Sequence, residues 1–323
     1  MEYAKVKENY TFKAENVVVA DSKRLDTRCI RGLTVLKDKR IAIMKSDTSI
    51  QIINPENFAC EAKTEAQIKP TPFSKFKEGK LCTLENGTIA SFFLTNEISV
   101  FSVENNKLTK VGSFNNDYFL KEWFYMTPLS KNRFATNINN IISIWKGDAP
   151  FQNEPLKEID CGGDVLRFIK LYEKETIAVL LNNEIRLYSL EDYSLKETIP
   201  IDTKTTNGCG LVQFDDDNLI IGAGVFNLKD KIYKKIYSDS DSEKEHSLTR
   251  GVRLRGNKVL MTDSCYVSDS YRCECYYNYY IHVMDPTTNE YSTKMEQTVL
   301  YLEVIDEHTL IRTEKDKAYI YKY

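Results

Sequence analysis

The 323-residue sequence has little histidine, glycine or proline and no long run of apolar residues. None of its three histidines has a metal-ligand spacing such as H-E-x-x-H. The phosphate-binding P-loop, the dinucleotide-binding glycine motif and the G-x-S-x-G motif of hydrolases are also absent. These absences disfavour the common enzyme classes, so we expect no catalytic residue and no cofactor.

Basic clusters and membrane-spanning segments are missing as well. The net charge is -3, with acids and bases mixed along the chain, which disfavours binding to a nucleic-acid backbone. No apolar run reaches the length needed to cross a bilayer, and the acid-containing start "MEYAKVKENY" does not resemble a signal peptide. We therefore expect eight cysteine thiols in a reducing compartment. That compartment is the cytoplasm, with the nucleus as an alternative.

What the sequence does contain is a repeat. Three stretches align well, beginning at Leu36, Leu84 and Leu129, and each has a short polar turn followed by two β-rich runs separated by a second turn. Four weaker copies follow. Successive anchor residues of what we take as the inner strand are 40 to 51 residues apart, at Ile41, Ile89, Phe134, Ile177, Leu219, Val259 and Leu310. That period is typical of a four-stranded propeller blade.

The repeat predicts the fold class. Runs such as "SIQIINP" and "EISVFSV" alternate apolar and polar residues, which puts every second side chain on one face of a strand. Helical spacing is hard to find over any long window. We predict an all-β, seven-bladed β-propeller of four-stranded antiparallel blades, because no single blade can bury both of its faces alone.

The two ends of the chain predict how the ring closes. The last copy stops after its third strand, at "DKAYIYKY", and thus lacks an outer strand. The N-terminal run at residues 3–12, "YAKVKENYTF", could supply it. We predict that this strand pairs with the C-terminal strand and completes the last blade, 298–323, since closure removes exposed strand edges. Residues 1–323 would then form a single domain.

The repeat resembles the WD40 family of β-propellers in length, strand order and closure. At the position of the family's Trp-Asp dipeptide, Trp145 keeps the aromatic residue and Asp285 keeps the acid. The other copies read Ile53-Asn54, Phe101-Ser102, Tyr188-Ser189 and Tyr321-Lys322. From these residues we expect no copy to assemble the family's buried His–Asp–Ser/Thr–Trp network. The resemblance implies a non-catalytic scaffold or platform for protein–protein interactions in an intracellular complex.

The most unusual stretch is "TDSCYVSDSYRCECYYNYY", residues 262–280. It lengthens the turn between the second and third strands of the sixth copy by 13 residues, because Ile41 to Ile50 is 9 positions and Val259 to Ile281 is 22. One interpretation is a zinc site made by Cys265, Cys273, Cys275 and His282. We prefer a long hairpin whose cysteines pack as small apolar groups, since C-x-C alone is a poor zinc signature.

This stretch could also bind a partner, because tyrosine is enriched at protein interfaces. In family propellers a hairpin at this position shares a rim with the connections between blades, and two other unusual connections would share it, 15–28 and 115–126. The predicted partner-binding residues are Tyr118, Trp123, Tyr266, Tyr271, Arg272 and Tyr276. The alternative function is a propeller enzyme of the hydrolase or lyase type, with its site in the central channel.

Three smaller stretches have plain structural interpretations. We interpret "GAGVFN" from Gly222 as a strand irregularity in the fifth and weakest copy. The run "KDKIYKK" that follows is predicted to be an exposed outer strand guarded by its lysines. The turn "KDKR", residues 37–40, is predicted to be solvated.

Overall fold

The computed structural model describes most of the chain and is made of β-strands. It describes residues 13–18, 30–57, 59–65, 79–92, 97–115, 125–172, 174–201, 210–213, 215–222, 224–235, 245–253, 259–269, 274–285, 290–296, 301–306, 309–314 and 317–322. Every regular element in these ranges is a strand. Within them, no helix has the length and apolar character needed to span a bilayer.

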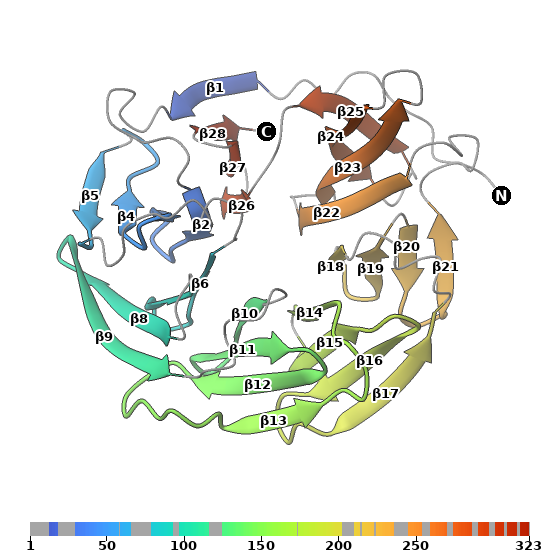
Figure 1. Ribbon diagram of the computed structural model, residues 1–323, viewed down its shortest axis with the longest axis horizontal. Helices are drawn as coiled ribbons and strands as arrows, with labels where there is room; N and C mark the ends of the chain where they lie inside the picture. The colour runs from blue at the N-terminus through green and yellow to red at the C-terminus, as the bar shows by residue number, and fades with distance from the viewer. Residues whose placement is uncertain are drawn as a thin grey trace. The chain divides into compact units, whose positions relative to one another are not determined.

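The described strands form seven four-stranded sheets (Figure 1). The chain also divides into two compact units: one holds β2 to β13, β27 and most of β1 and β28, and the other holds β14 to β26. In the first unit the sheets are β2 (Ile30–Val35), β3 (Ile41–Lys45), β4 (Ile50–Ile53), β5 (Cys60–Lys63); β6 (Lys80–Thr83), β7 (Ile89–Phe92), β8 (Glu97–Glu104), β9 (Lys107–Asn115); and β10 (Met126–Leu129), β11 (Arg133–Ile138), β12 (Ile141–Lys146), β13 (Lys157–Asp160).

The second unit contains three complete sheets of the same kind and β26. They are β14 (Arg167–Lys170), β15 (Thr176–Leu180), β16 (Glu184–Ser189), β17 (Leu195–Pro200); β18 (Leu211–Gln213), β19 (Asn218–Ile221), β20 (Gly224–Asn227), β21 (Ile232–Lys235); and β22 (Glu245–Arg253), β23 (Val259–Asp269), β24 (Glu274–Asp285), β25 (Glu290–Glu296). The seventh sheet has the order β1 (Lys13–Val18), β28 (Lys317–Lys322), β27 (Thr309–Glu314), β26 (Tyr301–Asp306).

The repeat anchors all occupy the same place in their sheets. Each lies at the first or second residue of the second strand. In six sheets the register pairs the anchor with a bulky residue of the third strand: Ile41 with Ile53, Ile89 with Phe101, Phe134 with Trp145, Ile177 with Tyr188, Leu219 with Phe226, and Val259 with Met284. The predicted period is therefore the distance along the chain between equivalent residues of successive sheets.

The prediction that these anchors mark the inner strand is wrong by one strand. Within each unit, neighbouring sheets approach each other through their first strands, β2 with β6 and β6 with β10 in one unit and β14, β18, β22 and β26 in succession in the other. First strands such as β18 (Leu-Val-Gln) and β6 (Lys-Leu-Cys-Thr) are short and poorly patterned. The second strands carry the stronger apolar signal, which is why the sequence points to them.

The hydrophobic core lies between the faces of successive sheets. Leu81, Ile89 and Phe101 face one cluster with residues of β2–β5, whereas Cys82 and Ala90, one position along each strand, face a second cluster with residues of β10–β13. Alternation along a strand thus buries both faces of the β6–β9 sheet. The β14–β17 and β18–β21 sheets share a third cluster in the other unit.

The N-terminal pairing differs in position from the prediction. β28 lies between β27 and β1, Lys13–Val18, and Ile320 of β28 is buried. Residues 3–12, for which the pairing was predicted, lie outside the described residues. This strand includes Glu15 to Val18, which were predicted to belong to the connection 15–28. Two of these four residues are β-branched valines, which favour strand structure.

The fifth copy, predicted to be the weakest, forms a complete four-stranded sheet, β18 to β21. Its "GAG" is not a strand irregularity but the turn between β19 and β20, where Gly222 has φ +53°. Gly224 follows as the first residue of β20, and a Cβ there would lie 2.4 Å from the Tyr233 ring. The "KDKIYKK" prediction is confirmed in that Ile232–Lys235 is the last strand of its sheet.

Candidate interaction site on the connection edge

In an antiparallel sheet the strands begin and finish at two opposite ends of the sheet. We use the word edge here for either of these two ends, not for an outermost strand. The turn between the second and third strands lies at the same edge as the segments that enter the first strand and leave the fourth. We call this the connection edge. The opposite edge, which we call the turn edge, carries the turns between strands one and two and between strands three and four.

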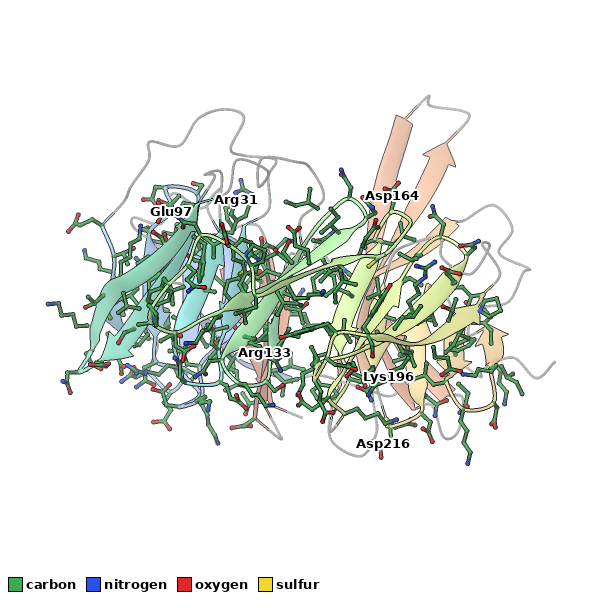
Figure 2. All side chains as sticks on the ribbon, turned by 90° about the horizontal axis from the view of Figure 1, so that it is seen from below. Arg31, Glu97, Arg133, Asp164, Lys196 and Asp216 are labelled. Atoms are coloured by element: carbon green, nitrogen blue, oxygen red, sulfur yellow. The ribbon has the colours of Figure 1, made fainter. Side chains whose placement is uncertain are left out.

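The largest feature on any described connection edge is the hairpin of β23 and β24, with 11 and 12 residues. It confirms the predicted lengthening: Ile41 and Ile53 are paired 12 positions apart, and Val259 and Met284 are paired 25 apart, a difference of 13. Figure 2 shows the paired strands standing clear of the other strands of their unit.

The outer part of this hairpin has only two described strands. β22 accompanies β23 as far as Tyr266, and β25 accompanies β24 only from Tyr279 onwards. The pairs from Val267–Tyr276 to Asp269–Glu274 therefore have no further strand beside them among the described ones. We call these three pairs the hairpin extension.

The predicted site residues are only partly located. Tyr266 and Tyr276 lie on β23 and β24, at the base of the hairpin extension and within it. Four others lie outside the described residues: Tyr118, Trp123, Tyr271 and Arg272. Their role as a partner-binding set stays a prediction.

The residues of the alternative zinc site are spread along the ladder. Cys265 is opposite Asn278, and Cys275 is opposite Ser268, which is three pairs further out. His282 is opposite Met261, four pairs from Cys265 in the other direction. At about 3.4 Å per residue these backbone positions are roughly 10 Å or more apart along the strands. Cys273 lies outside the described residues, and the site stays a prediction.

The connection edge of the β10–β13 sheet is held by a hydrogen-bond network. Asn140, in the turn between β11 and β12, donates from its side chain to Asp160 over 2.7 Å, and its carbonyl accepts from the Cys161 amide at 2.8 Å. Asp160 also accepts from the Gly162 amide at 2.8 Å. The segment leaving β13, which includes Asp164 (Figure 2), is thereby fixed to the turn. The sequence analysis did not identify this network.

A charged group on the same edge of the β6–β9 sheet is Glu97, the first residue of β8 (Figure 2). It forms an ion pair with Lys110 and accepts a 2.9 Å hydrogen bond from the Ser99 hydroxyl. Burial raises the pKa of Glu97, but the hydrogen bonds from Lys110 and Ser99 and the charge of Lys110 outweigh it and lower the pKa below its usual value. Glu97 is therefore a stably charged structural group.

The turn edges, by contrast, fasten neighbouring sheets together. Arg40 donates to Asp38 over 2.8 Å and, through its Nη1, to Glu61 and to Asn106 of the next sheet, both over 3.1 Å. The hydrogen bond to Asp38 raises the pKa of Arg40. The prediction that "KDKR" is only a solvated turn is wrong for Arg40, whose side chain is 18% exposed. The reason is the packing of the second sheet against this turn.

The second unit repeats this arrangement with different residues. The buried Gln213 of β18 accepts a hydrogen bond from the Tyr172 amide of the preceding sheet at 2.6 Å and donates to the Asp215 carbonyl at 2.9 Å. Lys174 donates to the Asp216 carbonyl at 2.6 Å. These polar groups are therefore occupied in the packing of one sheet against the next.

The groups that could do chemistry are sparse in the described part of the chain. Within it, no cluster of three or more His, Cys, Asp or Glu side chains is close enough to hold a metal ion. His246 and His282 lie on β22 and β24, and His308 lies outside the described residues. The Tyr233 hydroxyl, whose pKa is raised by burial, donates to the Ile221 carbonyl at 3.3 Å. This hydrogen bond lies within the β18–β21 sheet, so the Tyr233 hydroxyl has a structural role there.

Comparisons with known proteins identify the class of fold. No protein-family model matches the sequence, and no curated protein matches it. Among solved structures, one chain of the mitotic checkpoint complex is similar at TM-score 0.64 and 10% identity, covering 100% of this chain and 98% of the other. Virginiamycin B lyase from Staphylococcus aureus is similar at TM-score 0.65 and 14% identity, covering 93% and 96%.

The similarity to these solved structures and the repeated four-stranded sheets indicate the same fold. The protein has the fold of a β-propeller, with a sequence very different from those of both similar structures. At 10% and 14% identity these likenesses establish the fold and leave function to be argued from the residues.

Proposed function

We propose that this protein is a non-catalytic WD40-like platform for protein–protein interactions, acting as a scaffold subunit of an intracellular complex. In this proposal the seven sheets are seven blades of one propeller formed by residues 1–323. The pairing of an N-terminal strand with the C-terminal strand closes it. Support comes from the seven four-stranded sheets and from the position of β1 beside β28.

The observation that carries the proposal is the hairpin extension of β23 and β24. An isolated two-stranded hairpin is marginally stable in water. The described pairs of this hairpin run past the described parts of β22 and β25, which suits a structure completed by a partner strand. The partner-binding residues we propose are Tyr266 and Tyr276 on the strands, with Tyr271 and Arg272 between them and Tyr118 and Trp123 on an earlier connection.

The likenesses among solved structures are compatible with this function. One of them is a chain of a complex, as its name states. The competing function, a propeller enzyme of the hydrolase or lyase type, draws on the likeness to virginiamycin B lyase. That likeness is one of fold alone, and the same fold serves both purposes. The hairpin extension favours the platform.

The test removes the extension and keeps the sheet. Residues 267–276 are replaced by Asn-Gly, which preserves the Tyr266–Tyr277 pair and every pair that β22 or β25 covers. Intact and shortened proteins are used to capture partners from native lysate, and thermal melting confirms that the shortened protein folds. The matched control is Tyr172→Ala, which removes a 55% exposed tyrosine from a turn edge.

We expect a stoichiometric protein that binds the intact chain and the Tyr172→Ala variant and is lost with the extension. Retention of that protein by the shortened variant would move the site away from the hairpin. If the intact chain captures no protein, the platform function is wrong and the enzyme alternative takes its place.

A further inference from the structure

Two buried oxygen atoms on the turn edge of the β10–β13 sheet have no hydrogen-bond partner in the described part of the chain. They are the Oδ1 atoms of Asn132 and Asp148. Asn132 lies in the turn before β11, and Asp148 follows β12 by two residues. Both residues are half-buried, so solvent is close to each of them. Because buried polar atoms in proteins nearly always have a partner, two unpaired acceptors at one edge point to a bound group.

The backbone of Asn132 brings these two residues together. Its carbonyl accepts a 2.7 Å hydrogen bond from the amide of Gly147, and Asp148 is the next residue. A Cβ at position 147 would lie 2.8 Å from that carbonyl oxygen, so the two backbones approach as closely as a glycine allows. The strand register agrees, because the adjacent Arg133, labelled in Figure 2, is paired with Lys146. Asn132 and Asp148 are therefore neighbours at this edge.

A third oxygen-bearing side chain reaches the same turn from the neighbouring sheet. Glu85, in the turn between β6 and β7, accepts hydrogen bonds through Oε2 from the backbone amides of Lys131 and Asn132, the second over 3.3 Å. Two carboxylates and one amide oxygen thus meet at a single turn. The set differs from a cluster of three His, Cys, Asp or Glu side chains, because its third member is the Asn132 amide.

The backbone around Asp148 is held in place from both sides. Asp148 lies in residues 147–156, which connect β12 to β13 and which we call the strap. On one side of Asp148 the amide of Gly147 is hydrogen-bonded as described above. On the other side the ring of Phe151 packs edge-on against Phe114 of β9, with ring centroids 5.7 Å apart. A carboxylate on a backbone that is already fixed binds a ligand at a lower entropic cost.

We propose that Asn132, Asp148 and Glu85 form a binding site for a hard divalent cation, with Ca²⁺ as the best match. Carboxylate and amide oxygens are the ligands that Ca²⁺ takes, in a flexible geometry that waters complete, whereas Mg²⁺ demands a near-ideal octahedron. Because the chain supplies few ligands, we expect a weak dissociation constant of about 10⁻⁴ to 10⁻³ M. The inference does not rest on the proposed function, since the hairpin extension lies on a different sheet.

One positively charged group lies beside the strap. The ammonium group of Lys146 donates to the carbonyl of Ala149 at 3.5 Å. Its charge should weaken the binding of a cation through repulsion. Lys146→Met keeps most of the side chain and removes the charge, so this variant should bind Ca²⁺ more tightly than the unmodified chain. Weaker binding by this variant would contradict the placement of the cation at the strap.

The direct test is a calorimetric titration of metal-free protein with Ca²⁺, which should show one site per chain. Asp148→Asn and Asn132→Gly should each weaken binding at least about tenfold, since even the loss of a group that only supports a ligand costs about 10–100-fold. Glycine suits position 132 because Asn132 has φ +51°. The matched control is Asp164→Asn, which removes an exposed carboxylate at the connection edge of the same sheet (Figure 2) and should leave binding unchanged.

Melting temperatures with and without the cation distinguish this site from an internal hydrogen bond. Ca²⁺ should raise the melting temperature of the unmodified chain by mass action and leave that of Asp148→Asn unchanged. In a chelator, Asp148→Asn should melt no lower than the unmodified chain, because the Asp148 Oδ1 has no partner to lose. A lower melting temperature in the chelator, without a response to Ca²⁺, would mean that a water or the Asn132 amide group satisfies this oxygen, and would overturn the inference. An unmodified chain that binds no Ca²⁺ far above the expected dissociation constant also overturns it.

Discussion

The indole Nε1 of Trp145 donates a 2.9 Å hydrogen bond to the Thr136 hydroxyl, and both side chains are fully buried. Trp145 lies near the end of the third strand of its sheet and Thr136 lies in the second. This is the Trp–Ser/Thr contact of the network that the WD40 resemblance implies. The sequence analysis expected no copy to assemble that network, and in the third copy this part of it forms.

We predict that Trp145→Phe and Thr136→Val each lower the free energy of unfolding by about 1–3 kcal/mol, because each leaves one buried polar group without its partner. The double variant should lose clearly less than the sum of the two single losses. Chemical denaturation of the four proteins measures this coupling. Strict additivity would mean that the hydrogen bond contributes nothing specific.

A second prediction concerns the contact between Gly112 of β9 and Phe151. A Cβ at position 112 would lie 2.2 Å from the Phe151 ring, so Gly112→Ala should cost about 1–3 kcal/mol through overpacking. Gly112→Ala should be less harmful in a Phe151→Ala background, where the obstacle is gone. The adjacent Val111→Ala, at a position 44% exposed, should change stability by no more than about 0.5 kcal/mol.

The positions of the strands could be predicted from sequence because strand signals are local. An apolar anchor followed two positions later by another apolar residue is sufficient to place β3, with Ile41 and Ile43, or β15, with Ile177 and Val179. The pairing of Ile41 with Ile53 then follows from the short polar turn between the strands. The lengthened β23–β24 hairpin was visible for the same reason, as extra residues between two recognisable strands.

The contacts between sheets could not be predicted in this way. Arg40 reaches Asn106, 66 positions away, and nothing in "KDKR" distinguishes it from a solvated turn. Likewise Gln213 reads as an ordinary polar residue at the end of a three-residue strand. Its partner Tyr172 is identified only by the packing of one sheet against the next. Such contacts depend on tertiary geometry that a single sequence does not encode locally.

The third prediction follows from Gln213. Its buried side-chain amide accepts a hydrogen bond from the backbone N–H of Tyr172 and donates one to the carbonyl of Asp215. Gln213→Met keeps the side-chain volume but loses both hydrogen bonds, so it should lower the free energy of unfolding by about 1–3 kcal/mol. The measurement is urea denaturation against the unmodified chain. Gln51, a half-buried residue of β4, supplies a control: Gln51→Met should be close to neutral. Equal losses at both positions would contradict the role given to Gln213.

The last prediction is a pH dependence. Hydrogen bonds from Ser189 and Ser194 lower the pKa of Asp192 from 3.8 to about 2. A carboxyl group with a lowered pKa in the folded state stabilises that state above the unfolded pKa, and the contribution disappears as the pH falls through the folded pKa. The unmodified chain should therefore melt at a higher temperature than Asp192→Asn at pH 6. This difference in melting temperature should narrow between about pH 4 and pH 2.

The matched control is Asp192→Asn in a Ser189→Ala, Ser194→Ala background. The hydrogen bonds that lower the pKa of Asp192 are gone there, so the difference in melting temperature that Asp192→Asn causes at pH 6 should shrink. A melting-temperature difference between the unmodified chain and Asp192→Asn that stays constant from pH 6 to pH 2 would show that the carboxylate charge of Asp192 does not stabilise the turn between β16 and β17.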